Sequence, residues 1–362
     1  AKLKARNLFS DVKKEVLDGS SQNTKIINLI VEEQPTGEIS AGAGVGTNGG
    51  SFAFNIKENN WLGRGIKINT FVEADQETLK GAISVVDPNY NFSGNSLGWF
   101  VSSTKNDKPD SGYENNLMQT GITTTFEQYK DLYLTSSLSI THDDLKVDDT
   151  ASSSMKKQAG TFTDLAFDYG VRIDNRDKAY MPTSGYISSF SQTVPLYADS
   201  PYLRNKFTLS KYNSFGESII GSFKVFAAAI NGLSNEDVRI SKRARIPRSR
   251  LRGFVPGRVG PVDNKDWVGG NYAASINFET NLPKLLPESS KTDVGLFLDI
   301  GNVWGVDYDD SIDESNKLRS SVGINTSWLS PIGPMSFVLS QNLTKASTDE
   351  TQSFTFNLGT TF

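Results

Sequence analysis

The last residues of the chain alternate between two faces and finish on a phenylalanine. One face carries Phe354, Phe356, Leu358, Thr360 and Phe362, and the residues between them point the other way. A strand this apolar on one side invites aggregation when its edge is unpaired, and a closed barrel removes that edge. An aromatic terminus also suits the interfacial girdle of a membrane barrel. The segment therefore predicts the closing strand of an outer-membrane β-barrel.

The composition fits a chain that crosses a membrane with strands. It is 37% hydrophobic and has no run of eighteen apolar residues, so we expect no transmembrane helix. A large soluble β-sandwich or lectin has a similar composition and stays open on these numbers alone. The chain has no cysteine and one histidine, which leaves no disulfide framework and no clustered soft-metal site. We expect neither a metal nor a cofactor.

Internal segments repeat the alternation. On residues 165–173 every second residue is apolar, while Asp168 and Arg172 occupy the opposite face. A charged face opposite an apolar one indicates water inside and lipid outside. Residues 37–362 have room for sixteen strands at about twenty residues per strand plus connection. We predict an all-β chain whose residues 37–362 form a transmembrane antiparallel β-barrel, with sixteen strands.

The first 36 residues follow a different pattern. Residues 1–9 resemble the end of a helix, and residues 24–33 resemble a strand of a soluble domain. One helix end and one or two strands cannot bury a core alone. We interpret residues 1–36 as the C-terminal part of an α/β periplasmic domain.

Three local motifs lack the context that their chemistry requires. Residues 44–49 match a dinucleotide-binding pattern, but an alternating strand follows instead of a helix. Residues 94–98 match a nucleophile elbow, yet a strand follows here too, and we expect the single histidine, His142, in a loop. The acidic run from Asp307 to Glu314 lacks the glycine and the final acid of a calcium loop, and indicates a solvated loop. We predict no catalytic residue and no enzyme.

A long basic connection joins the strand that ends near Ala229 to the strand that starts at Gly269. Loops beyond about fifteen residues are usually functional or disordered. Between Arg239 and Arg258 the connection has many cations and no acidic residue. Few aromatics are interleaved with them, so we expect no nucleic acid. Either the loop faces anionic lipid head groups, or some of its cations enter the lumen.

Ordered motifs resemble those of the Omp85 superfamily. Leu251-Arg252-Gly253-Phe254 resembles the Arg-Gly-Phe/Tyr motif of the family's sixth extracellular loop. Residues 298–304, with Asp299 and Gly301, resemble the family's aspartate-glycine strand. Residues 59–65, 269–279, 319–323, 328–334 and Phe362 follow in the family's order, and residues 9–12 and 31–37 look like the end of its last POTRA domain. The resemblance covers essentially the whole chain.

The resemblance implies an insertase without covalent chemistry, of the branch that assembles outer-membrane proteins. It would receive unfolded outer-membrane proteins from the periplasm and fold them into the outer membrane of a Gram-negative-type bacterium. Its implied partners are these clients, outer-membrane lipids and periplasmic lipoprotein subunits, and its N-terminal part would lie in the periplasm. A secretion-type relative of the same family and a passive porin remain alternatives.

Glycines mark the predicted seam between the first and last strands. Gly42, Gly44 and Gly46 share one face of residues 39–46, and Gly359 lies in the last strand with Phe356, Leu358 and Phe362. Each glycine inside a strand costs about 0.5–1 kcal/mol relative to alanine. The seam should therefore be weak, and an open seam would offer an edge to a client strand. Alternatively, the glycines only bend the strand or relieve crowding.

Period-two counting places Glu279 and Asp299 on the inward face of adjacent strands. The fork of Arg252 can engage carboxylates through several charge-assisted hydrogen bonds. We hypothesise that Arg252 tethers the long loop inside the barrel, that Gly253 permits a tight turn and that Phe254 packs on the inner wall. A neighbour such as Arg245 should matter little.

Overall fold

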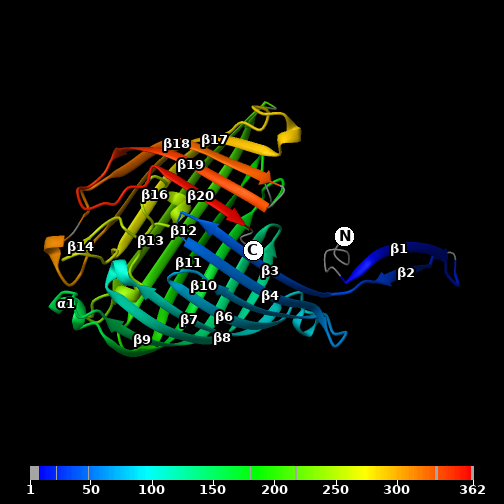
Figure 1. The fold of residues 1–362 in the computed structure, drawn as a ribbon. Coiled ribbons are helices and arrows are strands. Elements are labelled where there is room, and N and C mark those ends of the chain that lie inside the picture. The colour runs from blue at the N-terminus through cyan, green and yellow to red at the C-terminus, as the bar shows by residue number, and fades with distance from the viewer. Residues whose placement is uncertain are drawn as a thin grey trace.

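The structure is a computed structural model that describes residues 8–359 except 22, 48, 180, 217, 313, 331 and 332. Sixteen antiparallel strands close into a barrel (Figure 1), which confirms the predicted fold class and strand number. In chain order the barrel strands are β3 (Gly37–Gly46), β4 (Gly49–Trp61), β5 (Ile66–Ala74), β6 (Thr78–Asp87), β7 (Ser96–Lys108), β8 (Tyr113–Tyr129), β9 (Leu132–Val147), β10 (Gly160–Asp174), β11 (Gly185–Ala198), β12 (Tyr202–Phe215), β13 (Ile219–Gly232), β16 (Tyr272–Asn281), β17 (Thr292–Trp304), β18 (Arg319–Ser330), β19 (Gly333–Thr344) and β20 (Phe354–Gly359).

Each barrel strand pairs with the next along the chain, with two exceptions. β13 pairs with β16 across the long loop, and β20 returns to β3 to close the barrel. On β17, Phe297 and Asp299 are buried, whereas Leu296, next to Phe297 and on the opposite face, is 49% exposed. The charged Asp299 therefore lies on the inward face of β17, while Leu296 faces outward. In the described residues no helix has the length and apolarity to span a membrane.

Some strands are longer than a membrane requires. β8 has 17 residues and β9 has 16, whereas about 9–11 tilted residues cross a bilayer. His142 lies inside β9, so the expectation of a loop there is wrong. Its polar neighbours Asp143 and Asp144 also belong to this strand, which ends at Val147. One of them, Asp143, faces the lumen, is fully buried and accepts a hydrogen bond from Asn115 Nδ2 at 2.6 Å.

The N-terminal segment forms a separate hairpin of β1 (Phe9–Asp18) and β2 (Lys25–Glu33) that projects away from the barrel (Figure 1). Phe9 begins a strand, so the expected helix end is wrong at this residue, and residues 1–7 lie outside the described part of the chain. Apolar side chains of the hairpin are exposed, with Val16 at 51% and Ile27 at 59%. The assignment of residues 1–36 to a POTRA domain stays a prediction.

The largest buried core lies at one end of the barrel, where the long loop meets other connections. The loop, residues 233–271, contains the short hairpin of β14 (Val262–Asp263) and β15 (Asp266–Trp267). Its Ile240 and Val268 are fully buried against Met155 of the short helix α1 (Ser153–Lys156). The loop is therefore a packed part of the fold, which places its basic side chains against the barrel wall.

Candidate functional site: the loop tether and the seam

Arg252 joins the long loop to the inner wall formed by β16 and β17. Its Nε and Nη2 donate to Asp299 Oδ2 and Oδ1, each at 2.8 Å, and its backbone N–H donates to Oδ2 at 3.0 Å. Its Nη1 donates to Glu279 Oε1 at 3.4 Å. The Asp299 side chain is fully buried and that of Arg252 is 13% exposed. The structure thus brings the arginine together with both inward carboxylates.

Three further side chains complete this cluster. Lys224 Nζ donates to Glu279 Oε2 at 2.6 Å, and Asn277 Nδ2 donates to Asp299 Oδ1 at 2.8 Å. The Phe297 ring lies under the guanidinium, with its centroid 3.6 Å from Arg252 Cζ. Sequence reasoning missed all three, although period-two counting marks each of them as inward-facing. The buried carboxylates are consequently matched by more than one donor, as groups removed from water must be.

Two glycines let the loop backbone approach the wall. Gly253 has φ +89°, and a Cβ built on it would lie 3.2 Å from Ser321 Cβ of β18. Ser321 Oγ donates to the Arg252 carbonyl in the same place. A Cβ on Gly301 of β17 would lie 2.9 Å from Ile246 Cδ1 of the loop. Both positions favour glycine because of close packing, and Gly253 also because of its backbone conformation.

Phe254 packs mainly within the loop. It is buried, forms a small cluster with Leu251 and Val259, and makes an isolated bridge to Thr351 in the β19–β20 connection. The backbone at Phe254 therefore links the loop to the segment that leads into the last strand.

A second charged cluster holds the start of the loop. Arg243 donates to Asp307, whose Oδ2 also accepts from Asn271 Nδ2 at 2.9 Å and from the Val238 N–H at 2.8 Å. Burial alone would raise the pKa of Asp307, but the Arg243 charge and these hydrogen bonds outweigh it and hold the pKa below its ordinary value of 3.8. Asp307 is exposed to solvent, in keeping with the predicted solvated acidic loop, and in addition it is tied to Arg243 and Asn271.

The seam between β20 and β3 is joined over a short register. Asn357 pairs with Gly46, Leu358 with Val45 and Gly359 with Gly44. By comparison, the β3–β4 ladder runs the full length of β3, from the pair Gly37–Glu58 to the pair Gly46–Gly49. Residues 360–362, including Phe362, lie outside the described part of the chain. Over the described residues, the closing contact is the least extended ladder of the barrel.

The turn after β3 adds to the seam. The Thr47 N–H donates to the Phe356 carbonyl at 3.0 Å, and the Phe356 N–H donates to Thr47 Oγ1 at 2.8 Å. A side-chain hydroxyl thus replaces a backbone carbonyl in the ladder. We find the seam closed, and held by backbone and hydroxyl groups in this region.

The seam glycines permit a close approach of the two strands. A Cβ on Gly46 would lie 2.6 Å from the Phe356 carbonyl oxygen. Gly359 has φ +118°, and a Cβ on it would lie 2.4 Å from the Ala43 carbonyl oxygen. Gly42, which pairs with Ala53 of β4, shares the half-buried face of β3 with Gly44 and Gly46. The geometry supports relief of crowding, and it still leaves the seam without side-chain contacts at these positions.

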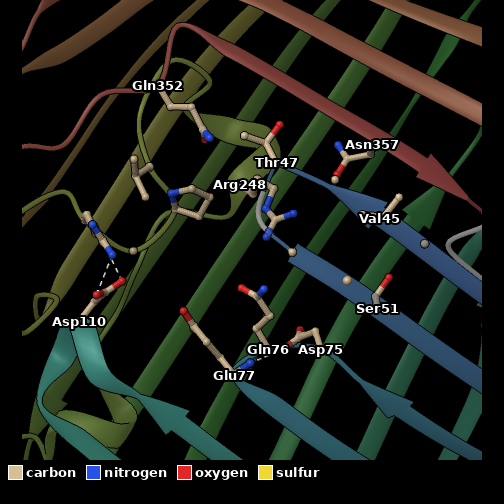
Figure 2. Close-up of a pocket in the computed structure, with 18 of the residues that line it drawn as sticks. Val45, Thr47, Ser51, Asp75, Gln76, Glu77, Asp110, Arg248, Gln352 and Asn357 are labelled. Atoms are coloured by element: carbon tan, nitrogen blue, oxygen red, sulfur yellow. Dashed lines mark hydrogen bonds and ion pairs between the residues drawn. The ribbon is translucent and has the colours of Figure 1, made fainter.

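A chamber of about 830 Å³ lies behind the seam, between β3 and the long loop. Figure 2 shows Thr47 and Asn357 on its seam side, with Arg248 and Gln352 close to them and Asp110 farther away, in the β7–β8 connection. Arg248 is exposed and makes no hydrogen bond or ion pair with any residue that the structure describes. The seam and the tethered loop therefore border the same space.

Comparisons with known proteins agree with this architecture. Residues 60–362 match the Omp85 superfamily domain. The chain is 26% identical over 350 residues to the outer membrane protein assembly factor BamA of Neorickettsia risticii, and covers 46% of that relative. It is 24% identical over 401 residues to BamA of Neisseria meningitidis and covers 48% of it; 93% of the chain takes part in each match. The chain thus spans about half the length of these two relatives.

The crystal structure of BamA from Haemophilus ducreyi lacking POTRA domains 1–3 superimposes with a TM-score of 0.88 at 22% identity, covering 100% of this chain and 77% of that one. This likeness concerns the fold alone. The barrel and the bacterial relatives place the chain in a bacterial outer membrane. Since the family match extends from the end of β4 to the end of the chain, well over half of its residues, the chain belongs to the Omp85 superfamily.

Proposed function

We propose that this chain is the barrel part of an outer membrane protein assembly factor. It accepts unfolded outer-membrane proteins on the periplasmic side and folds them into the bilayer, and this activity makes and breaks no covalent bond. Its partners are the client proteins, outer-membrane lipids and periplasmic lipoprotein subunits of an assembly complex. The observation that carries the proposal is the short, glycine-lined seam between β3 and β20.

The seam supports this activity because a parted strand pair exposes unpaired backbone groups. Those groups can template the terminal strand of a client by β-augmentation. Opening at another strand pair would break a far longer ladder, such as the one from Tyr113–Val147 to Tyr129–Leu132 between β8 and β9. Opening at the seam disrupts fewer backbone hydrogen bonds, so the hydrogen bonds to a client strand can replace those lost between β3 and β20.

The tethered loop argues against a passive pore. Arg252 and Gly253 lie against the inner faces of β17 and β18, and the start of the loop is packed at one end of the barrel. A loop held against the inner wall takes up lumen space that an unobstructed pore would leave free. A barrel that moves clients sideways into lipid does not need an open lumen.

Reconstitution of the full-length protein in liposomes tests the proposal. An unfolded eight-stranded outer-membrane protein is added from urea, and its folded fraction is followed by resistance to protease. We expect faster folding than in empty liposomes of the same lipid composition. Ion conductance without faster folding would support a porin instead. Client protein recovered inside the liposome lumen would support a secretion barrel.

A further inference from the structure

Arg258, near the tip of the long loop, contacts both sides of the seam. Its Nε and Nη2 donate to Asp110 Oδ2 and Oδ1 at 2.6 and 2.7 Å (Figure 2), and its Nη1 donates to Glu350 Oε2. Asp110 lies in the β7–β8 connection, on the β3 side of the seam. Glu350 lies in the β19–β20 connection, on the other side. One guanidinium thus joins two parts of the barrel that separate when the seam parts.

The Glu350 end of this link is coupled to the last strand. The Val255 N–H donates to the Glu350 carbonyl at 3.0 Å, and the Glu350 N–H donates to the Arg258 carbonyl at 3.2 Å. The Gln352 N–H donates to the Gly253 carbonyl at 3.0 Å, two residues before β20 begins at Phe354. Movement of β20 away from β3 would therefore pull on the loop tip, and through it on Arg258.

The ion pairs of Arg258 are partly solvated. Its side chain is 29% exposed, and those of Asp110 and Glu350 are 34% and 43% exposed. Such pairs are weak and screened by salt, so they can break and re-form. Arg319 differs: it is fully buried and donates to Asp349 Oδ1 at 2.8 Å within the same β19–β20 connection. The connection is firmly anchored by Arg319, whereas its link across the seam is a reversible one.

We propose that Arg258 is a salt-sensitive latch, a positioning residue that holds the seam closed by joining Asp110 to Glu350. The proposal rests on the proposed function, since it concerns the opening of the same seam. The latch adds to the short β20–β3 ladder without being part of it, so it sets how often the seam opens but leaves the template edge unchanged.

Spin-label distances in the full-length protein, reconstituted in a lipid bilayer, test the latch. Labels are placed through Val45→Cys and Leu358→Cys, which pair across the seam, and the ratio of open to closed populations is measured. Arg258→Gln keeps the length and loses the charge. We expect it to raise that ratio about fivefold at low salt, the effect of losing weak exposed ion pairs. The difference should vanish at about 1 M salt, where the Debye length is about 3 Å.

Arg248→Gln is the matched control, because Arg248 borders the same chamber in the same loop and has no partner among the described residues. It should leave the ratio at the parent value. An Arg258→Gln ratio equal to that of the parent at low salt would overturn the latch, as would an equal response of both variants. If Arg258→Gln opens the seam but client folding in the same liposomes keeps the parent rate, the latch stands and the proposed function fails.

Discussion

The wall formed by β16 and β17 and the seam formed by β3 and β20 are held by different forces. At the wall, Arg252, Glu279 and Asp299 form a buried network with several charge-assisted hydrogen bonds. At the seam, backbone groups and one threonine hydroxyl make the contacts, and glycines face each other. Buried charges that lose a partner are strongly destabilised, whereas exposed backbone groups can pair with water or another strand. The barrel therefore has one wall that resists change and one that can part reversibly.

The difference explains how the molecule can open without unfolding. The barrel opens first at the strand pair whose separation costs the least free energy, which is the short β20–β3 ladder. The tethered loop stays on the β16–β18 wall, which is joined to β20 through β19, and keeps its contact with the β19–β20 connection. The loop can thus stay bound to β20 through the β19–β20 connection while the seam opens and the rest of the barrel remains folded.

Removing the tether should have the largest effect. Arg252→Ala leaves the buried Asp299 carboxylate without its main partner, which typically costs about 3–5 kcal/mol. We expect the loop to become accessible to protease and client folding to fall. A double-mutant cycle with Asp299→Asn, measured by denaturant unfolding of the full-length protein, should show strong coupling. A coupling energy near zero would contradict the account of the wall.

Arg248→Ala is the control for this variant and should change neither quantity, because Arg248 has no partner among the described residues. Arg245, which the sequence predicted to matter little, would be a poorer control because its side chain has partners in the structure. Its Nη2 donates to Ser111 Oγ at 2.9 Å and to the Trp267 carbonyl at 3.1 Å.

A substitution at the seam should have a smaller effect of a different kind. Gly359→Ala places a methyl group against the Ala43 carbonyl at a φ of +118°, which we expect to cost about 1–3 kcal/mol in the closed state. The open population should rise in spin-label distances across the seam. Gly50→Ala on β4 is the control, since its Cβ would meet only the Gly44 carbonyl at 3.8 Å. Equal open populations in the two variants would argue that the seam glycines do not control closure.

The smallest expected effect is a pH dependence of the charged cluster around Asp307 at the start of the long loop. The pKa of Asp307 is lowered in the folded state, so its stabilisation is present above a pH of about 4 and is lost as pH falls through the folded pKa. The protection of the Val238 amide against hydrogen exchange, measured relative to its intrinsic rate at each pH, should fall over that acid range, because this amide donates to Asp307. In Asp307→Asn this pH dependence should be absent. The same pH dependence in variant and parent would assign the effect to another group.

Much of the barrel could be predicted from the sequence because its signals are local. Alternation with a period of two marks the strands and their inward faces, which is why Glu279 and Asp299 could be placed on neighbouring strands. The strand count followed from length. His142 was misplaced because a run of polar residues inside a long strand looks like a loop in the sequence.

The latch and the clusters around Asp307 and Arg319 could not be predicted, because their partners are distant in sequence. Arg258 meets Asp110 148 residues away and Glu350 92 residues away. The basic composition of the loop indicates that its cations need carboxylate partners if they are buried. Which carboxylates they pair with depends on how the loop packs against the barrel. For the seam, the glycines in the sequence indicated a weak pairing of the first and last strands. Only the backbone geometry shows how closely the two strands approach each other at these glycines.

A disulfide across the seam tests the central claim most directly. Residues 1–362 contain no cysteine, so Val45→Cys and Leu358→Cys introduce one register pair that can be oxidised in the folded full-length protein. The control, Ile122→Cys with Leu138→Cys, locks the β8–β9 pair on the same outer surface. We predict that the seam disulfide abolishes client folding, that reduction restores it, and that the β8–β9 disulfide has no effect. Full client folding with a completely formed seam disulfide would contradict the account.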